Sequence, residues 1–598
     1  MRLNTIQTND VLLRDPARGC WLLFRRPVHI LVANCAEEVI PVLQQLDRSV
    51  NNLGLYAAGF IAYEAAPGFD PALSAKPAST FPLVWFGLYE KPEVLSKSPI
   101  ALTDQPGGPF PTWSASITRQ EYDAAIANVK AAIAKGETYQ VNYTYRLAAS
   151  FDTDPLAFFY ELVRAQNAPY AALIDTGSFM LCSASPELFF SLDGALITSR
   201  PMKGTASRGR TLQEDLEQRS WLRHSAKNQA ENVMIVDMVR NDIGRIARIG
   251  SVQVPELYTV EKFPTVWQMV STVIGETDAE LSEIFSALFP PASITGAPKV
   301  RTMEIIEDLE TSARHIYTGC IGFISPERKA QFNVAIRTVL IDKSTCRAEY
   351  GTGGGITWDS VDAAEFEECQ TKAKILTTRI PHFSLLESIL WSPEGGFFLL
   401  EYHLKRLEDS ANYFSFPVDL RAVRTHLAGL AGSLGAHSVK VRLLINEDGK
   451  ITTQVENLPP PDEKRPLRAC LAPAPIDSAD PFLYHKTTHR QIYERARQSC
   501  PPDQAGPWDE VILWNENGEI TEACSANIIV EIDGELVTPP VACGLLPGTY
   551  RAWLLEQGKI KEKVIRLEDL SRVSRLYLIN SVRKQRLARL CLPVSLEG

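Results

Sequence analysis

The length of this chain, 598 residues, is the feature that most constrains its fold, because one hydrophobic core rarely serves more than about 250–300 residues. Domains of about 100–200 residues predict three or four compact units, with room for more than one function. Hydrophobic residues make up 45% and charged residues 22% of the chain, as in ordinary globular proteins. We therefore expect a core in each unit.

Charge and cysteine usage exclude several classes of protein. The net charge of −10 includes no basic block and no acidic tail, which argues against a nucleic-acid partner. No apolar run reaches the ~18 residues of a membrane span, and Met1–Thr5 does not begin a secretory signal, so we expect a cytoplasmic protein with no membrane partner. The 11 cysteines form no Cys-x-x-Cys pair, and no P-loop or dinucleotide-binding glycine motif occurs.

Breaks in composition suggest domain boundaries. Pro92–Pro111 is rich in Pro, Gly and Ser, and Leu458–Pro481 is rich in Pro. The main boundary is placed at about residue 380, because a new motif pattern begins near Phe383. The expected domains are 1–110, 111–380, 381–470 and 471–598.

Local patterns predict a mixed α+β fold. Thr118 and Glu121 have the spacing of a capping box ahead of a helix that ends near Gly136, and Gln140–Leu147 alternates apolar and polar residues like a strand. Other predicted elements are neighbouring antiparallel strands at Phe179–Cys182, Leu188–Leu192 and Ala195–Ser199, helices at Asn228–Val239 and Asp362–Leu376, and turns at Asn517–Gly518 and Asp533–Gly534.

Acidic residues on the last two predicted helices suggest a cation site. Helical spacing places Glu365, Glu368 and Lys372 on one face. Glu231 opens an apolar stretch, where an acid needs a partner or a cation. Because Mg²⁺ prefers oxygen ligands and bridges to anionic substrates, these carboxylates are candidate magnesium ligands. A solvated charged face is the alternative.

Longer motifs connect this region with a known family. They occur in order between Ile117 and Leu376, as Arg200–Thr205 (RPMKGT), Ala230–Asp237 (AENVMIVD) and Ser293–Lys299 (SITGAPK). Together they resemble the chorismate-utilising enzymes, which include anthranilate, aminodeoxychorismate, isochorismate and salicylate synthases. The resemblance implies antiparallel sheets flanked by helices and a chorismate site, with 1–110 as the N-terminal part of the synthase and 111–380 as its catalytic domain.

The resemblance also implies roles for individual residues. Glu231 and Glu368, with Glu365 close by, are implied to hold Mg²⁺, and Glu187 is implied to protonate the departing hydroxyl. The residues implied to bind chorismate are Thr295, Arg337 on a strand at Phe332–Thr338, Lys372, and the backbone amides of Gly353, Gly354 and Gly355 in a glycine-rich turn, which we interpret as an anion-binding nest.

Two positions distinguish between the reactions of this family. Relatives that add water have a lysine base at the position of Gln140, so glutamine there disfavours isochorismate and salicylate synthesis. At Lys203, anthranilate synthases have a small residue, whereas many aminodeoxychorismate synthases have a lysine proposed to attack C2 before ammonia displaces it at C4. Lys203 is the candidate nucleophile, and a salt bridge is its alternative role. Gln268 departs from the histidine of many relatives.

The source of ammonia lies outside the motifs of this sequence. Gly319–Gly322 has the wrong spacing for the nucleophile elbow of a glutaminase. We therefore expect a separate glutamine amidotransferase subunit to supply ammonia, with free ammonia as the alternative.

A second group of motifs follows residue 380. His403–Leu407, Lys486, Glu519–Glu522 and Leu546–Thr549 have the order and spacing of fold-type IV pyridoxal-phosphate enzymes. From Phe383 to Leu592 the chain resembles the aminodeoxychorismate lyases, which implies a small lobe at 381–470 and a large lobe at 471–598. The sequence around Lys486, together with Ile579–Arg583, favours lyases over transaminases.

This second resemblance implies a cofactor and its ligands. Lys486 is implied to bind pyridoxal 5'-phosphate covalently and to move protons, and Glu522 to keep the pyridine nitrogen protonated. Arg406 and Thr549 are implied to bind the phosphate. Taken singly, these residues are equally consistent with surface charges or turn positions. Ala523–Cys524 departs from the small residues of many relatives.

Together the resemblances predict an enzyme that converts chorismate and ammonia to 4-amino-4-deoxychorismate and then eliminates pyruvate to give the folate precursor 4-aminobenzoate. The expected cofactors are Mg²⁺ and pyridoxal 5'-phosphate, and a homodimer through the second half is a further expectation. One alternative is an anthranilate synthase component fused to a transaminase, which Lys203 disfavours. Another is a synthase with an inactive C-terminal docking module.

Overall fold

The computed structural model describes residues 5–78, 80–96, 99, 110–459, 465–504 and 506–591. Unit 1 comprises Met1–Ser207 and Arg219–Ile380, and unit 2 comprises Arg208–Gln218 and Pro381–Gly598. Most of the expected linker Pro92–Pro111 and part of the Pro-rich stretch lie outside the described residues. The assignment of 208–218 to unit 2 has no counterpart among the expectations from sequence.

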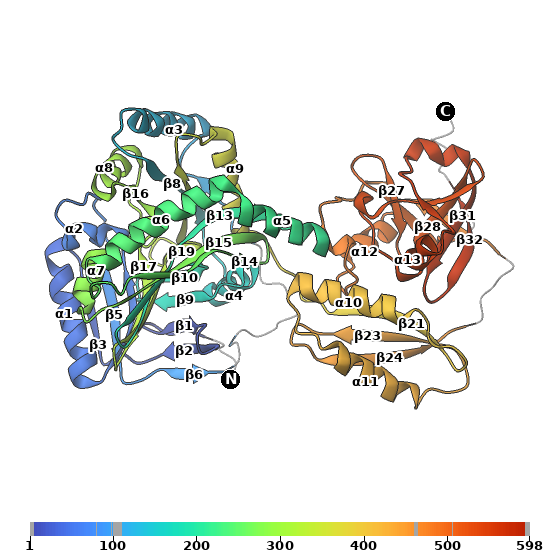
Figure 1. Ribbon diagram of the computed structural model, residues 1–598, viewed down its shortest axis with the longest axis horizontal. Helices are drawn as coiled ribbons and strands as arrows, with labels where there is room; N and C mark the ends of the chain where they lie inside the picture. The colour runs from blue at the N-terminus through green and yellow to red at the C-terminus, as the bar shows by residue number, and fades with distance from the viewer. Residues whose placement is uncertain are drawn as a thin grey trace. The chain divides into compact units, whose positions relative to one another are not determined.

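The described residues of unit 1 form two large antiparallel sheets (Figure 1). The first runs in the order β16 (Gly296–Ala297), β8 (Gln140–Ser150), β20 (Arg347–Ile356), β19 (Thr338–Asp342), β10 (Phe179–Ser185), β9 (Tyr170–Asp175), β1 (Val11–Asp15), β2 (Cys20–Phe24) and β6 (Glu93–Leu95), with β7 (Ser114–Ala115) beside β8. The second runs in the order β13 (Met202–Ser207), β15 (Val266–Glu276), β12 (Leu196–Arg200), β11 (Leu188–Asp193), β18 (Lys329–Val334), β17 (Cys320–Ser325), β4 (Tyr56–Ile61), β5 (Val84–Tyr89) and β3 (His29–Ala33), with β14 (Gln253–Lys262) beside β15.

Helices surround these sheets. They are α1 (Ala36–Leu53), α2 (Ala66–Phe69), α3 (Arg119–Ala134), α4 (Pro155–Gln166), α6 (Ala226–Gly244), α7 (Leu281–Leu288), α8 (Lys299–Leu309) and α9 (Asp362–Ala373), with the short turns η1 (Tyr63–Ala65), η2 (Ala292–Ile294) and η3 (Lys374–Leu376). The helix α5 (Leu212–His224) begins in unit 2 and ends in unit 1. Helix α1 lies beside β3 and β5 (Figure 1).

The core of unit 1 explains this layering. Leu13 of the first sheet and Phe60 and Phe323 of the second belong to one buried cluster, so the two sheets pack face to face. The other face of the second sheet is covered by α1 and α7, whose Leu43 and Phe285 share a second buried cluster. Burial of aromatic residues on both faces supplies the hydrophobic stabilisation that positions the strands.

Several local predictions for unit 1 are confirmed. Thr118 caps α3: its hydroxyl accepts a hydrogen bond from the Glu121 amide at 3.2 Å, and the Glu121 carboxylate accepts one from the Thr118 amide at 2.7 Å. The strand at Gln140–Leu147 forms the first part of β8, and the two long helices correspond to α6 and α9.

Two strand predictions are wrong in part. Although β11 and β12 are antiparallel neighbours, β10 pairs with β9 and β19 in the other sheet. Pro186 separates β10 from β11, and it has no amide hydrogen to continue a ladder. Arg337 lies between β18 and β19 with φ +53°, so Phe332–Thr338 is two strands and not one.

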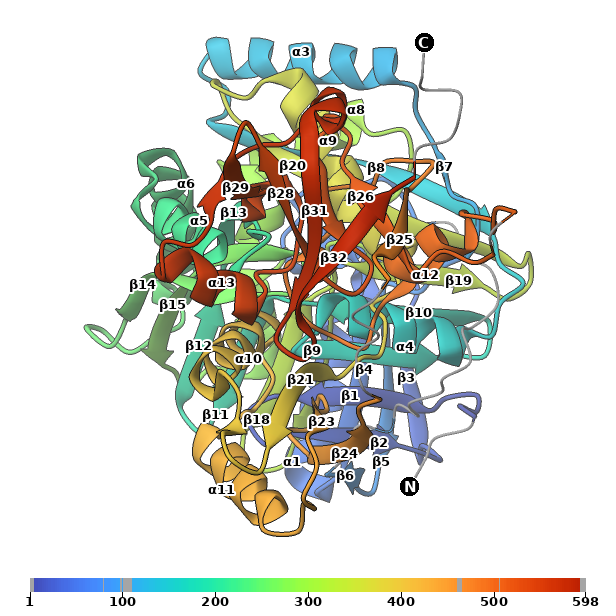
Figure 2. The same ribbon diagram turned by 90° about the vertical axis from the view of Figure 1, so that its right-hand side faces the viewer.

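Unit 2 contains a smaller and a larger sheet in its described residues. The smaller runs in the order β22 (Gly396–Phe397), β21 (Leu385–Ser392), β23 (Val439–Ile445) and β24 (Ile451–Asn457). The larger runs in the order β27 (Ile520–Ala523), β26 (Glu510–Trp514), β25 (Leu467–Leu471), β32 (Lys584–Leu590), β31 (Val573–Asn580), β28 (Asn527–Ile532), β29 (Glu535–Thr538) and β30 (Lys561–Glu562). Figure 2 shows β28, β31 and β32 side by side.

The helices of unit 2 are α10 (Leu400–Phe414), α11 (Leu420–Ala431), α12 (Gln491–Gln498) and α13 (Thr549–Glu556), with the short turns η4 (Pro481–Leu483), η5 (Val541–Cys543) and η6 (Leu567–Arg572). Leu404 of α10, Val423 of α11 and Val441 of β23 share one buried cluster, so these helices pack on the smaller sheet. The turn predicted at Asn517–Gly518 joins β26 and β27 as an antiparallel hairpin. The mixed α+β class is therefore confirmed in both units. Across the described part of the chain, no helix is long and apolar enough to cross a membrane.

Candidate active sites

The glycines expected to form a nest lie in strand β20. Gly353 pairs with Thr144 of β8, and the Thr144 amide donates to Glu310 at 3.0 Å instead of to β20. Because facing residues of an antiparallel pair alternate between bonded and non-bonded, the Gly353 and Gly355 amides point away from β8. Lys372 Nζ donates to Gly353 O at 2.9 Å on that side. The predicted turn is therefore wrong, although these strand-edge amides can still receive a carboxylate.

Side chains approach this strand so closely that a Cβ atom at Gly355 or Gly354 would displace them. A Cβ atom at Gly355 would lie 2.5 Å from Lys203 Nζ and 2.6 Å from Gln140 Nε2, and one at Gly354 would lie 3.1 Å from Glu365 Oε2. The Gln140 amide is buried, and neither its nitrogen nor its oxygen has a hydrogen-bond partner within the described residues. Since an unpaired buried amide is costly, Gln140 is placed to bind a ligand.

Lys203 is held by contacts to its backbone. Its carbonyl oxygen accepts a hydrogen bond from Asn232 Nδ2 of α6 at 3.3 Å, and Asn232 Oδ1 accepts one from the Ser271 hydroxyl at 2.6 Å. Gln268 Nε2 donates to Gly204 O, the next carbonyl, at 3.0 Å. These contacts of Asn232 could not be predicted from the sequence, because motif spacing does not reveal contacts between a helix and a strand.

Glu187 follows β10 and is almost fully buried. Burial raises the pKa of its carboxyl to about 7, although Ser293, the Met202 amide and the charge of Lys203 oppose the shift. A carboxyl with this pKa holds a proton for part of the time near neutral pH. Glu187 can therefore donate a proton, and its role as the general acid stays a prediction.

Helix α9 and the Arg337 loop form the other side of this site. Lys372 Nζ contacts Glu368 at 2.7 Å, and the Ser360 hydroxyl donates to Glu365 at 2.7 Å. Arg337 donates to the Lys372 carbonyl oxygen. The charge of Lys372 is the main cause that lowers the pKa of Glu368, whereas burial raises that of Glu365. The cationic groups of Arg337 and Lys372 thus lie on one side of β20.

The expected magnesium ligands are not gathered into one cluster. Glu231 Oε1 lies 4.0 Å from Lys227 Nζ, and Glu368 is paired with Lys372. Among the residues that the structure describes, no group of three or more His, Cys, Asp and Glu side chains could hold a metal ion. Any Mg²⁺ here would need oxygen ligands from a substrate or water in addition to the glutamates.

Thr295 is buried beside the start of β16. Its hydroxyl contacts Pro291 O and Ala292 O, both at 3.4 Å, and its carbonyl oxygen accepts from the Asn142 amide at 2.8 Å. In this arrangement the Thr295 side chain contacts its own loop, and a role in substrate binding stays a prediction.

Unit 2 contains a cavity of about 480 Å³ that brings together the predicted cofactor residues. Lys486, Arg406, Glu522 and Thr549 all line it, although they lie far apart in the sequence. Its volume lies within the range of about 300–1,000 Å³ typical of small-molecule sites.

The Lys486 side chain is half-buried in the lining of this cavity. Burial lowers its pKa to about 7, and the nearby charges of Arg406 and Arg490 act in the same direction. Glu387 and Glu522 oppose the shift. A lysine that is partly neutral near pH 7 can act as a nucleophile and as a base.

Glu522, on β27, has partners on both of its oxygens. Oε1 accepts hydrogen bonds from the Tyr493 hydroxyl at 2.8 Å and the Leu546 amide at 3.2 Å, and Oε2 accepts one from Asn527 Nδ2 at 3.1 Å. Burial nevertheless raises its pKa to about 7. This oriented carboxyl group can share a proton with a ring nitrogen. Tyr493 and Asn527 are support residues that the sequence analysis missed.

Arg406 is oriented by an acid that the sequence analysis also missed. Its Nε and Nη2 donate to the two oxygens of Glu387 at 2.9 and 2.6 Å, and its Nη1 donates to Pro547 O at 3.1 Å. Thr549, the first residue of α13, contacts His403 Nε2 through its hydroxyl at 3.4 Å. A cation beside the start of a helix suits an anion such as a phosphate.

Each half of the chain matches a family of known proteins. Residues 9–378 match the family described as chorismate binding enzyme, and residues 384–594 match amino-transferase class IV. The second match implies pyridoxal 5'-phosphate as a cofactor, and the arrangement around Lys486 fits this group.

Curated relatives match part of the chain. Aminodeoxychorismate synthase component 1 of Salmonella typhimurium is 43% identical over 260 residues, which cover 43% of this chain and 56% of the relative. The protein of the same name from Bacillus subtilis is 39% identical over 288 residues, covering 48% of this chain and 60% of the relative. The chain thus spans less than two thirds of the length of these relatives.

A solved structure supports the fold of unit 1. Anthranilate synthase component I from Streptococcus pneumoniae superposes with a TM-score of 0.52 at 24% identity, covering 63% of this chain and 94% of that one. At this identity the likeness establishes the fold alone.

Proposed function

Because the chain belongs to the family of chorismate binding enzymes, we propose that it converts chorismate and ammonia to 4-amino-4-deoxychorismate and then releases pyruvate to form 4-aminobenzoate. The observation that carries the proposal is the packing of Lys203 and Gln140 against Gly355. It supplies a nucleophile where the synthases of anthranilate have a small residue.

The synthase step needs a nucleophile and an acid. The amine of Lys203 forms a bond to C2 while the bond between C4 and oxygen breaks, and Glu187 donates its proton so that the hydroxyl leaves as water. Ammonia then forms a bond to C4 as the bond between C2 and Lys203 breaks. This restores the free lysine, and a base takes the surplus proton.

Chorismate would bind on the positively charged side of β20. Its two carboxylates are matched by Arg337, Lys372 and the outward amides of Gly353 and Gly355. Glu231 and Glu368, with Glu365 close by, would hold Mg²⁺ together with oxygen ligands from substrate or water, because magnesium prefers oxygen ligands and keeps several from outside the protein. Gln140 is a neutral amide, which suits contact with a hydroxyl and does not suit deprotonation of water.

The lyase step uses the cavity of unit 2. Pyridoxal 5'-phosphate, when bound, supplies an electron sink for the bond that breaks. Arg406 and Thr549 would hold its phosphate, and Glu522 would hold a proton at its ring nitrogen. Lys486, whose pKa is lowered to about 7, takes the proton from C4 as the bond between C3 and the ether oxygen breaks, and it returns that proton to the departing enolpyruvate, so that pyruvate and an aromatic ring result.

Two further assignments complete the proposal. A separate glutamine amidotransferase subunit supplies the ammonia, in keeping with relatives that are named component 1. The lyase half pairs as a homodimer, which sedimentation of the purified protein would test.

Product analysis tests the proposed function. The purified protein is incubated with chorismate, ammonium and Mg²⁺, with and without pyridoxal 5'-phosphate, and the products are identified by mass spectrometry. We expect 4-aminobenzoate with the cofactor and 4-amino-4-deoxychorismate without it. Anthranilate as the product would overturn the assignment of the synthase half, and accumulation of 4-amino-4-deoxychorismate despite bound cofactor would overturn that of the lyase half.

A further inference from the structure

A short piece of the synthase sequence is part of unit 2. Arg208–Gln218 belongs to unit 2, whereas Ser207 before it and Arg219 after it belong to unit 1. The segment directly follows β13, the strand of Lys203, and ends within α5. Its contacts inside unit 2 indicate a purpose beyond linking two stretches of unit 1.

Arg208 anchors the segment at its first residue. Its guanidinium donates to both oxygens of Asp215 at 2.6 and 2.8 Å and to Tyr413 O at 2.9 Å, and it lies 4.5 Å from the centre of the Tyr413 ring. The side chains of Arg208 and Asp215 are only 8% and 1% exposed. A buried, bidentate ion pair stacked on an aromatic ring has a fixed geometry.

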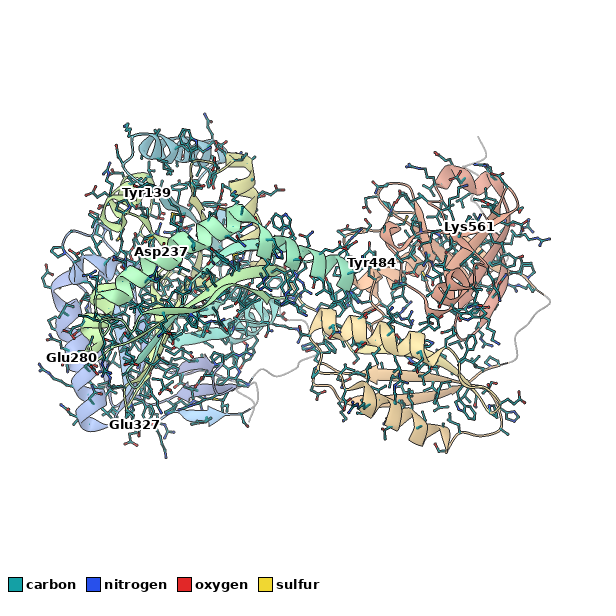
Figure 3. The ribbon with its side chains drawn as sticks, viewed as in Figure 1. Tyr139, Asp237, Glu280, Glu327, Tyr484 and Lys561 are labelled. Carbon is teal, nitrogen blue, oxygen red and sulfur yellow. The ribbon has the colours of Figure 1, made fainter. Side chains whose placement is uncertain are left out.

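The turn at Gly209 packs closely against Tyr413 and Asp215. The Tyr413 hydroxyl donates to Gly209 O at 2.7 Å, and a Cβ at Gly209 would lie 2.2 Å from the Asp215 amide nitrogen. Arg210 Nη1 donates to the Tyr484 hydroxyl at 3.0 Å. Figure 3 labels Tyr484 beside the start of α5. The segment therefore forms hydrogen bonds with both Tyr413 and Tyr484.

These two tyrosines flank the residue next to the cofactor lysine. The ring of His485 stacks on Tyr413, with centroids 4.3 Å apart, and its Nδ1 contacts the Ser410 hydroxyl at 3.0 Å. Tyr484 and His485 directly precede Lys486, whose carbonyl oxygen accepts from the Leu386 amide at 2.9 Å. The contacts of Arg208–Gln218 with Tyr413 and Tyr484 thus hold the backbone before Lys486 in place. The hydrogen bond from β21 holds the backbone of Lys486 itself.

We propose that Arg208–Gln218 is a positioning segment for Lys486, so that a turn encoded within the synthase sequence is required for the full rate of the lyase reaction. Arg208 and Tyr413 are positioning residues, because they act on Lys486 through His485. The effect on the lyase reaction rests on the proposed function, whereas the contact between the segment and the residues before Lys486 does not. A displacement of a reactive group by about 1 Å costs up to about 100-fold in rate, so even slight loosening is measurable.

The test uses the full chain. Arg208→Ala is compared with Arg424→Ala, which removes an equivalent bidentate ion pair, with Glu401, from the exposed surface of unit 2. Hydrogen exchange without added cofactor is measured at residues 484–488. We expect exchange there to accelerate about tenfold or more in Arg208→Ala and to stay unchanged in Arg424→Ala, as expected when a buried anchor is lost. Tyr413→Phe, which keeps the ring and removes the bond to Gly209, should show a smaller acceleration and serves if Arg208→Ala does not fold.

A kinetic arm separates positioning from general stability. With 4-amino-4-deoxychorismate supplied directly, Arg208→Ala should lower the lyase kcat about tenfold with little change in KM, since misplacement of Lys486 acts on the chemical step. Wild-type exchange at 484–488 together with wild-type kcat in both Arg208→Ala and Tyr413→Phe would overturn the proposal. If the wild-type protein itself does not act on this substrate, the proposed function fails, while hydrogen exchange still decides whether the segment fixes the backbone before Lys486.

Discussion

Glu387 binds Arg406 in the interior of unit 2 through two hydrogen bonds of 2.9 and 2.6 Å. Burial alone would raise the pKa of Glu387, but the charge of Arg406 and the hydrogen bonds from His403 and Arg406 hold it at about 2. The acid is therefore ionised throughout the physiological range and aims the guanidinium, whose Nη1 also reaches Pro547 O beside the start of α13.

Replacement of this acid should weaken cofactor binding. Glu387→Gln keeps the shape of the side chain but removes the charge that orients Arg406, and loss of a partner from a buried ion pair costs about 3–5 kcal/mol of unfolding free energy. We expect the Kd for pyridoxal 5'-phosphate to rise about tenfold, as is typical when an outer residue stops orienting a ligand. Absorbance titration measures this. Glu401→Gln, which breaks the exposed pair with Arg424, is the matched control and should bind the cofactor normally.

A methyl group at Gly355 should block the synthase. In Gly355→Ala the added carbon would meet Lys203 Nζ and Gln140 Nε2 at 2.5 and 2.6 Å, so one or both side chains must move. We expect a loss of about 100-fold in the formation of 4-amino-4-deoxychorismate, with the lyase rate unchanged, because misplacement by about 1 Å has this effect. The control is Gly244→Ala at the end of α6, where nothing lies within 4 Å of the new carbon. Equal rates in the two variants would contradict the placement of Lys203.

The pH dependence of the synthase should report Glu187. Burial raises the pKa of this acid to about 7, and only the protonated form can donate a proton. The proton is present below pH 7 and is lost as the pH rises through 7, so the rate of the synthase step at saturating ammonia should fall above that pH. Glu187→Gln should abolish this descending limb along with most activity. An unchanged limb in Glu187→Gln would assign it to another group.

Magnesium removal should separate the two halves. A chelator should stop formation of 4-amino-4-deoxychorismate, because the proposed site at Glu231 and Glu368 would need the cation to bind an anionic substrate. The lyase rate on supplied 4-amino-4-deoxychorismate should not change, since its cavity is lined by Lys486, Arg406 and other side chains that need no metal. If metal analysis shows that the ion has been removed and the synthase is still fully active, Mg²⁺ has no role in this reaction.

Features set by neighbouring residues could be predicted from the sequence. The cap at Thr118 and the hairpin at Asn517–Gly518 depend on a few adjacent side chains, and both are present. The conformation of Gly353–Gly355 could not be predicted in this way. Glycine-rich sequence is typical of turns, and only pairing with β8, some two hundred residues earlier in the chain, makes this stretch a strand.

The residues of the candidate sites also divide into those that the sequence predicts and those that it does not. Residue types and motif order singled out Lys486, Arg406, Glu522 and Thr549, and all four line one cavity, although their role in binding a cofactor stays a prediction. Glu387 carried no signal of its own, because a single acid in an apolar strand is compatible with many partners. Arg208–Gln218 also gave none, since its arginines and acids resemble an exposed helix start until burial is known.

Lys203 and Lys486 are proposed to serve two successive reactions, and one product analysis distinguishes their roles. Wild type, Lys203→Ala and Lys486→Ala are each given chorismate, ammonium, Mg²⁺ and pyridoxal 5'-phosphate, and all aromatic and cyclohexadiene products are identified by mass spectrometry. We predict 4-aminobenzoate from wild type, accumulated 4-amino-4-deoxychorismate from Lys486→Ala, and neither compound in quantity from Lys203→Ala. Anthranilate from wild type, or 4-aminobenzoate at the wild-type rate from either variant, would contradict the claim.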